Sequence, residues 1–191
     1  MTRQAHKLIT HLLPLVAIVL VASIGTSCAN DNADTKALIA RAEQGDAFAQ
    51  YDLGLMYDNG RGVLQDYKEA VKWHRKAAEQ GYAASQFNLG WSYANGEGVL
   101  QDYKEAVKWY RKAAEQGYAP AQHKLGWSYA LGRGALKDTV NAYAWFNVSS
   151  ANGSDNGSDN RGIIAKEMTP EQIAKAQELS KVWFEKFQPK E

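Results

Sequence analysis

The sequence feature that most constrains this chain is a near-exact internal repeat. Tyr67–Asp102 is followed directly by Tyr103–Asp138, and the two blocks agree at 27 of their 36 positions. The same frame extends backward through Leu53-Gly54 and forward to Trp145. A fixed period in the thirties is typical of chains that stack small units, each of which contacts only its neighbours. The repeat therefore predicts a stacked array rather than a domain folded around one central core.

Each copy of the repeat is expected to form two helices. In the first full copy the predicted helices cover about Ala47–Asp58 and about Tyr67–Gln80. The first ends at a glycine-rich turn, because glycine accepts the left-handed backbone that helix ends often need. Asp66 and Glu69 have the spacing of a capping box at the start of the second helix. Apolar side chains then recur at three- and four-residue spacing, which predicts one buried face and an all-α fold of helix pairs.

The array is expected to cover residues 35–153 and to be closed at both ends by partial units. Its full copies are expected at about 46–81, 82–117 and 118–153. A truncated helix over about Lys36–Gln44 would close the first end. Residues 154–191 would form a polar loop, centred on the turn-rich Asn152–Asn160, and C-terminal capping helices, the last of which starts at Thr169-Pro170. The apolar stripe of this last helix is expected at Leu179, Val182, Trp183 and Phe187.

The N-terminal segment has the pattern of a secretory signal peptide. Met1–Lys7 carries two basic residues and no acidic one, and Leu12–Ile24 is nearly all apolar. This apolar stretch is shorter than the roughly 20 residues that a membrane-spanning helix needs. A charged start followed by a short apolar middle is typical of a signal peptide. We therefore expect export, with a signal peptide over residues 1–27.

The end of that segment predicts lipidation. Ile24–Cys28 resembles a bacterial lipobox, in which the cysteine is lipidated and becomes the new N-terminus, although Gly25 stands where leucine is favoured. Residues 28–34 would then form a short tether. The alternatives are simple secretion after a cut behind Ala29, and an uncleaved anchor. Because an alanine rather than an aspartate follows Cys28, the expected location is the outer membrane of a bacterial cell envelope, facing the periplasm.

Charge and cysteine content exclude several classes of site. The formal net charge is +1, and removal of the two basic residues of the signal segment leaves 20 Lys+Arg against 21 Asp+Glu, or −1. A near-neutral surface has no general attraction for nucleic acid, and no nucleic-acid partner is expected. Cys28 is the only cysteine, so no intrachain disulfide and no thiolate cluster for zinc can form.

No constellation of catalytic or metal-binding residues is found in the sequence. His74 occupies the slot that Tyr110 and Phe146 fill in later copies, so it is expected to pack rather than to bind a metal. Ser92 lies in a motif that lacks the second glycine of a nucleophile elbow, and it falls inside a predicted helix. The turn-rich segment after Asn152 lacks the glutamate that a calcium loop needs at its twelfth position. The chain is therefore predicted to be neither an enzyme nor a cofactor-binding protein.

Basic residues form a stripe along each second helix. We interpret the stripe as a solvated outer face that Glu69 and Glu79 partly neutralise, with contact to an anionic envelope surface as the alternative. Its members are Lys68, Lys72, Arg75, Lys76, Lys104, Lys108, Arg111 and Lys112.

The repeat resembles the Sel-1-like repeat (SLR) family, a relative of the tetratricopeptide repeat (TPR). The motif Ala-x-x-Gln-x-x-Leu-Gly-x-x-Tyr stands at Ala83–Tyr93, Gly-x-Gly-Val at Gly96–Val99, and Asp-Tyr-x-x-Ala-x-x-Trp-x-x-Lys-Ala-Ala-x-Gln-Gly at Asp102–Gly117. The resemblance covers about Lys36–Trp183. It implies a right-handed α-solenoid that is used for protein–protein contact. Cysteine-rich relatives are named as β-lactamases, but this chain lacks their cysteine pairs, so that activity is not carried over.

The resulting hypothesis is an exported, lipid-anchored scaffold that binds an envelope protein or peptide on its concave face. One alternative is a module that binds the cell wall or peptidoglycan, since the chain is rich in aromatic residues. The other is a β-lactamase-like or muropeptide hydrolase, which rests on family analogy alone.

The resemblance also indicates where the binding residues would lie. In tetratricopeptide-like arrays the first helix of each repeat lines the concave side, and the positions two before and two after the repeat leucine point into the groove. Large aromatic side chains there would supply anchor area. The alternative is that Trp91 and Trp127 merely pack between adjacent first helices. The predicted protein-binding residues are Tyr51, Leu55, Phe87, Trp91, His123 and Trp127.

Overall fold

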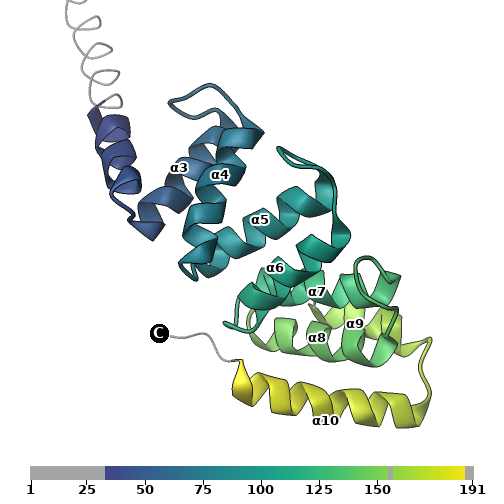
Figure 1. The fold of residues 1–191 in the computed structure, drawn as a ribbon. Helices are drawn as coiled ribbons and strands as arrows, with labels where there is room; N and C mark the ends of the chain where they lie inside the picture. Colours follow the sequence, from purple (N-terminus) through teal and green to yellow (C-terminus); the bar gives the residue numbers. More distant parts are fainter. Residues whose placement is uncertain (1–32, 155–156, 188–191) are drawn as a thin grey trace, which may run out of the picture.

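The computed structural model describes residues 33–154 and 157–187, and within these ranges the regular secondary structure is helical throughout, with turns and short loops between the helices. A helical segment over residues 33–43 comes first (Figure 1). The helices that follow are α3 (Ala47–Asn59), α4 (Tyr67–Glu79), α5 (Ala83–Asn95), α6 (Tyr103–Ala114), α7 (Ala119–Leu131), α8 (Thr139–Ala151), α9 (Gly157–Ala165) and α10 (Pro170–Lys186). The expected signal peptide and Cys28 lie outside the described residues.

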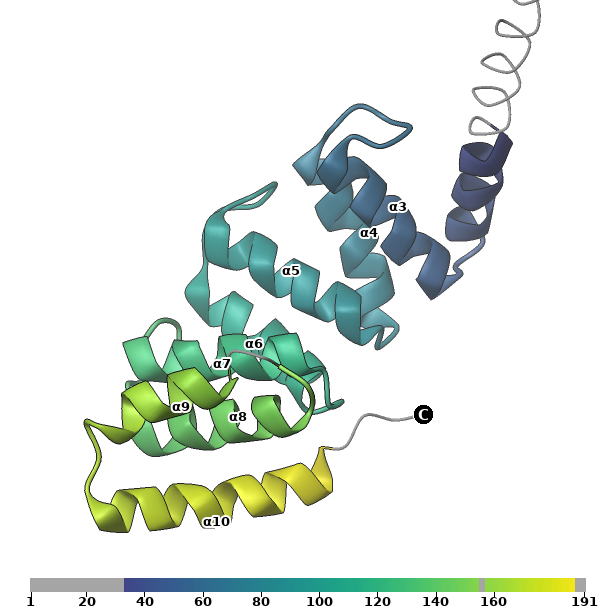
Figure 2. The ribbon, with the colours of Figure 1, turned by 180° about the vertical axis from the view of Figure 1, so that it is seen from behind.

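The helices pack in the order of the sequence. The pairs α3–α4, α5–α6 and α7–α8 are each an antiparallel hairpin, and each second helix also contacts the first helix of the next pair. Figures 1 and 2 show the pairs stacked along one curved array. The predicted all-α, right-handed α-solenoid of helix pairs is confirmed. No helix within the described residues combines the length and the apolar character that crossing a membrane requires.

Local signals set the helix ends as expected, with one difference. The Asp66 carboxylate accepts hydrogen bonds from the backbone N–H groups of Lys68 and Glu69, at 2.8 and 3.1 Å, and so caps α4. Glu69 does not complete the predicted capping box, because its carboxylate pairs instead with Lys72 Nζ, at 2.5 Å. Lys72 lies one helical turn after Glu69, and its full positive charge attracts the Glu69 carboxylate more strongly than a single backbone N–H does. Each first helix ends at a glycine in the left-handed region, as Gly96 does with a φ of 76°.

Buried glutamines join each repeat to the next. Gln86 is only 4% exposed, and its amide donates to the Ala78 carbonyl at the end of the preceding second helix, at 3.1 Å. Its own carbonyl oxygen accepts a hydrogen bond from Gln116, at 2.7 Å. In the same way, the Gln50 amide donates to the Ala42 carbonyl and the Gln122 amide donates to the Ala114 carbonyl. Each of these carbonyls also accepts from the backbone N–H of the glycine three residues later, so the buried glutamine adds a second hydrogen bond where the helix ends.

The leucine and glycine of the motif bring the two helices of a pair together. Leu89 is fully buried, and the adjacent Gly90 leaves no room for a side chain. A Cβ atom at Gly90 would lie 2.7 Å from Tyr110 Cδ1 and 3.2 Å from the Ala106 carbonyl oxygen. Gly54 and Gly126 face His74 and Phe146 in the same way.

Gly90→Leu is expected to lower the free energy of unfolding by about 1–3 kcal/mol, because overpacking a close helix contact forces the α5–α6 pair apart. Thermal unfolding followed by circular dichroism measures the change. A larger residue at Ala106, which is 2% exposed, should have the same effect. An unchanged melting curve for Gly90→Leu would contradict the packing described above.

The final helices close the array, with two departures from expectation. Trp145 of α8 lies against Trp183 of α10 and Phe187, which caps the C-terminal end of α10, with ring centroids 4.4 and 5.7 Å apart. The predicted member Val182 is wrong, since it is 50% exposed. Ser180 lies buried on the packed face instead and accepts a hydrogen bond from Asn147 at 2.8 Å.

The segment predicted as a polar loop is partly helical. Helix α9 begins at Gly157, within the expected loop. Gly157 is buried so closely against α8 that a Cβ would lie 2.7 Å from the Phe146 carbonyl oxygen. Arg161 further fixes α9 by donating to the Asn147 side chain, at 2.5 Å. Contacts with α8 thus stabilise a helix that the local sequence does not favour.

Candidate functional site

The three predicted binding residues that stand two positions before each repeat leucine lie between helices rather than fully in a groove. Tyr51, Phe87 and His123 are half-buried. Each contacts the ring that faces it from the second helix of its own pair, with centroids 5.6–5.9 Å apart. These facing rings belong to His74, Tyr110 and Phe146.

The same three side chains also contact the elements that follow them. Tyr51 lies 5.0 Å from the Tyr82 ring, and Phe87 lies 5.6 Å from the Tyr118 ring, measured between centroids. His123 Nε2 lies 2.6 Å from the side-chain amide of Asn160 in α9. Burial, together with the charge of the adjacent lysine, lowers the pKa of His123, so its ring stays neutral at pH 7. These positions contribute to the joints between repeats, and of the three only Phe87 also borders a pocket described below.

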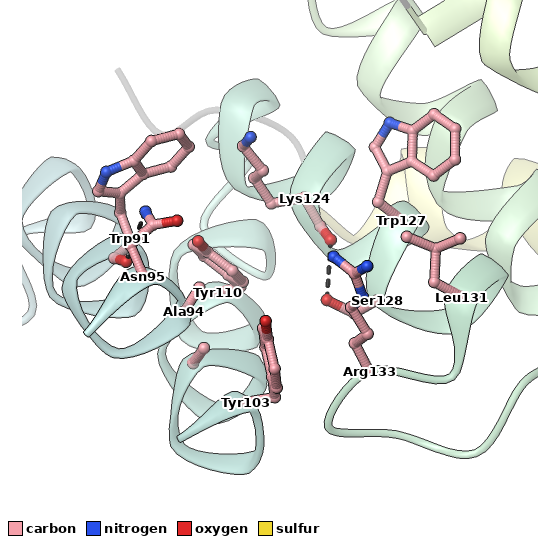
Figure 3. Close-up of a pocket in the computed structure, with 11 residues that line it drawn as sticks. Trp91, Ala94, Asn95, Tyr103, Tyr110, Lys124, Trp127, Ser128, Leu131 and Arg133 are labelled. Atoms are coloured by element: carbon pink, nitrogen blue, oxygen red, sulfur yellow. Dashed lines mark hydrogen bonds between the residues drawn. The ribbon is translucent and has the colours of Figure 1, made fainter. Parts of the chain in front are cut away.

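The other three predicted residues, Leu55, Trp91 and Trp127, line two pockets between successive first helices. The α5–α7 pocket lies between α5 and α7 above the first half of α6 (Figure 3). The α3–α5 pocket lies one repeat earlier, in the same position. Their volumes are about 260 and 430 Å³, the first just below and the second in the lower part of the range of about 300–1,000 Å³ for small-molecule sites. Trp91 borders both pockets and is 39% exposed.

The α5–α7 pocket combines aromatic rings with two cations. Figure 3 shows Lys124 between Trp91 and Trp127, with Tyr103 and Arg133 at the other side of the opening. Lys124 Nζ lies 4.4 Å from the centre of the Trp91 ring, and the Arg133 guanidinium carbon lies 5.8 Å from the centre of the Tyr103 ring. Both distances fall within the range of cation–π attraction. Burial lowers the pKa of Lys124, which reflects partial loss of its water shell.

The α3–α5 pocket has the opposite charge. Asp58 and Glu97 line it, together with Tyr67, Asn88 and the shared Trp91. Asp58 Oδ2 lies 2.9 Å from His74 Nε2, and His74 itself is fully buried beneath the pocket. The prediction that His74 packs inside the repeat is confirmed, and the structure adds its contact with Asp58.

The charged residues of both pockets were missed by reasoning on the aromatic positions alone, although the repeat contains a signal for them. The two blocks differ at 9 positions, which is 36 minus 27. Five of these nine pairs supply at least one side chain to a pocket. They are His74/Tyr110, Phe87/His123, Asn88/Lys124, Asn95/Leu131 and Glu97/Arg133. Variation between otherwise identical units is therefore concentrated at the pockets.

The basic residues along the second helices mostly contact other residues of this protein. Lys72 pairs with Glu69, and Lys108 pairs with Glu105 in the next copy. Arg75 donates to the Tyr93 hydroxyl of the following first helix, at 2.7 Å. Several cations of the stripe are thus neutralised locally or used between repeats. Within residues 33–154 and 157–187, no three His, Cys, Asp or Glu side chains cluster as a metal site would require.

Comparison with known proteins identifies solved structures that resemble this helix array. Among solved structures, the chain is similar to c5321, a protective antigen of uropathogenic Escherichia coli with an SLR fold, at 35% identity and a TM-score of 0.64. That match covers 81% of this chain but only 41% of the antigen. A Sel1 repeat protein from Oxalobacter formigenes is similar at 39% identity and a TM-score of 0.63, over 68% of this chain and 97% of that one.

A third solved structure shares the fold alone. Cysteine-rich protein B of Helicobacter pylori is 22% identical, with a TM-score of 0.53, over 67% of this chain and 95% of that one. A comparison with curated protein sequences finds no match. The family model described as the Sel1 repeat matches three times, at residues 47–82, 83–118 and 119–154. Because these matches cover more than half of its length, the chain belongs to the Sel1 repeat family.

Proposed function

We propose that this protein is a scaffold that binds a protein or peptide of the cell envelope in the groove formed by α3, α5 and α7. The observation that carries the proposal is the pair of aromatic-lined pockets at the same position in successive repeats. Sel1 repeat proteins generally mediate protein–protein interaction, which supports a protein ligand. The role is one of binding rather than catalysis, in keeping with a groove built from aromatic anchors on packed helices and single charges on those helices and in the turns that follow them.

Trp91 is the natural anchor of such a groove. It borders both pockets and keeps 39% of its surface exposed, so a partner can bury a large apolar area against it. An aromatic side chain of this kind loses little conformational entropy on binding and dominates interface energetics. The helices that carry it are held by the buried glutamine and leucine contacts, so the surface is formed before a partner arrives.

Affinity capture from the native envelope tests the proposal. The full chain should recover a protein partner at a constant ratio, and Trp91→Ala should lose it while keeping the wild-type melting curve. Trp73→Ala is the matched control, because Trp73 lies on a second helix, where it packs against the core of the first repeat and Lys76 and lines neither pocket. It should keep the partner at temperatures where its melting curve shows it to be folded. Repeated recovery of the wild-type chain alone would count against a scaffold.

We also propose that the chain is exported and anchored by lipid at Cys28, on the periplasmic side of the outer membrane. The basic start, the short apolar stretch and the small residues before Cys28 support this proposal. The wild type should incorporate labelled palmitate and partition into detergent, and Cys28→Ala should do neither. A mature, unmodified N-terminus at Asn30 would instead indicate simple secretion.

A cell-wall ligand is the second candidate, and the exposed tryptophan of the groove is the observation that favours it, since an indole face can also stack on a sugar ring. Purified sacculi should then retain the wild-type chain and release Trp91→Ala. Retention of both proteins alike would place any wall contact outside the groove.

A further inference from the structure

The two pockets of the groove are equivalent by position but opposite in charge. They occupy the same place in successive repeats and share Trp91. The α5–α7 pocket contains Lys124 and Arg133. The α3–α5 pocket contains Asp58 and Glu97. One continuous surface therefore has a positive end and a negative end, with an exposed indole between them.

The cations of the α5–α7 pocket lack an acidic partner. Among the described residues, no carboxylate oxygen lies within 4.0 Å of Lys124 Nζ or of the Arg133 guanidinium. Each is held against an aromatic ring instead, Lys124 at Trp91 and Arg133 at Tyr103. This differs from the outer lysines Lys72 and Lys108, which are paired with glutamates of their own helices. Such unpaired, positioned cations can accept a carboxylate without first breaking an ion pair.

At the negative end, one of the two carboxylates has no side-chain cation partner among the described residues, and the other contacts only His74. Glu97 has no basic group within ion-pair distance in the part of the chain that the structure describes. Asp58 contacts His74 and keeps 27% of its side chain exposed toward the α3–α5 pocket. Asn88 is neutral at the place where Lys124 stands in the next pocket. A cation would therefore meet two carboxylates there and no competing lysine.

The opposite charges do not come from the repeat framework. Glu97 and Arg133 occupy the same position in two blocks that are otherwise nearly identical, as do Asn88 and Lys124. The helix caps, the buried leucines and the buried glutamines are the same in both blocks. Two of the three positions at which the blocks differ in charge line the pockets, and the third, Gln101/Lys137, lies outside them, where Lys137 pairs with Glu167. Opposite charges at equivalent pocket positions are what selective recognition of a ligand with two different ends would require.

We propose that the groove binds an extended segment of a partner protein that carries an acidic and a basic side chain on either side of an apolar one. The acidic side chain would lie between Lys124 and Arg133, the basic one near Asp58 and Glu97, and the apolar one against Trp91. The inference rests on the proposed scaffold function and specifies its ligand. A polyanion such as an anionic lipid surface or a nucleic acid fits less well, because the α3–α5 pocket would repel it.

Selection from a displayed library of random dodecapeptides tests the proposal with the full chain as bait. The wild type should enrich peptides that contain both an acidic and a basic residue around an aromatic or aliphatic one. Lys124→Glu with Arg133→Glu should enrich peptides that have lost the acidic residue, and it should bind wild-type-selected peptides at least about tenfold more weakly. Glu97→Arg should instead select peptides that have lost the basic residue.

Lys72→Glu with Lys108→Glu is the matched control, because it changes the net charge by the same amount on the second helices, away from both pockets. It should select the same peptides as the wild type. Melting curves establish that each variant is folded. If the double charge reversal does not fold, Lys124→Gln with Arg133→Gln replaces it and should lose the acidic preference.

The outcomes separate this inference from the function on which it rests. Peptide pools that are the same for the wild type and the pocket variants would overturn the charge pattern, while a partner captured through Trp91 would leave the scaffold function in place. Retention on purified sacculi that depends on Lys124 and Arg133, with no peptide enriched, would overturn the peptide ligand. No enriched peptide and no captured partner would reject both proposals.

Discussion

Trp145→Ala is expected to lower the free energy of unfolding by about 3–5 kcal/mol, the cost usual for removing a buried tryptophan. Trp145 is 1% exposed and packs between the core of the last repeats and the aromatic rings of α10. Its indole N–H has no hydrogen-bond acceptor among the described residues, so packing is what the substitution removes. For a chain of this length the melting temperature should fall by roughly 6–20 °C.

The loss should begin at the C-terminal end. In a stacked array each unit depends on its neighbours, and α10 contacts the array chiefly through α8. Hydrogen exchange should therefore show reduced protection in α10, with α3 and α4 retaining theirs. Trp91→Ala is the matched control, because the same residue type is removed from an exposed position, and its melting temperature should change little. Equal effects of the two substitutions would contradict the capping role of α10.

Gly98→Ala is expected to cost about 2–5 kcal/mol, which combines two sources of strain. Gly98 has a φ of 71°, and a residue with a side chain pays about 1–2 kcal/mol in that region. A Cβ atom would also lie 2.1 Å from the backbone carbonyl oxygen of Tyr67 at the start of α4. Because a backbone atom cannot rotate away as a side chain can, the turn must move, at a further cost of about 1–3 kcal/mol.

Gly81→Ala separates the two sources. Gly81 also has a positive φ, of 94°, but no atom lies within 4 Å of the place where its Cβ would be. It should therefore cost only the backbone strain of about 1–2 kcal/mol. Urea unfolding of both variants measures the difference. If Gly81→Ala proved as destabilising as Gly98→Ala, the close contact between Gly98 and the start of α4 would contribute nothing to the loss of stability.

The displaced turn should also affect the groove. Glu97 precedes Gly98 directly, and both Glu97 and Tyr67 line the α3–α5 pocket. Gly98→Ala is therefore expected to weaken binding of any ligand that uses the negative end of the groove, even at temperatures where the variant is folded.

The sequence by itself determined the repeating architecture, because every signal for it is local. Asp66 accepts from N–H groups two and three residues ahead of it, and Gly96 ends its helix through its own backbone freedom. The apolar spacing around Leu89 depends only on the pitch of one helix. Such signals do not need a distant partner, and they occur again in each copy of the near-identical repeat.

The tertiary structure decided which side chains face one another across repeats. Periodicity favoured Val182 as a packed residue, but the packing of α10 against α8 buries Ser180 instead. The turn-rich Asn152–Asn160 indicated a loop, but from Gly157 onward this segment is helical, because Gly157 packs closely against α8. Both outcomes depend on surfaces far away in the sequence, which no local pattern encodes.

The groove shows the same division. The spacing of the repeat placed Leu55, Trp91 and Trp127 on the first helices, where they border the pockets. Only the three-dimensional stacking brought Lys124 to Trp91 and Arg133 to Tyr103, since these pairs are 33 and 30 positions apart in the chain. The proposed binding role of these two cations depends on the aromatic rings beside them, and the packing of one repeat on the next supplies those rings.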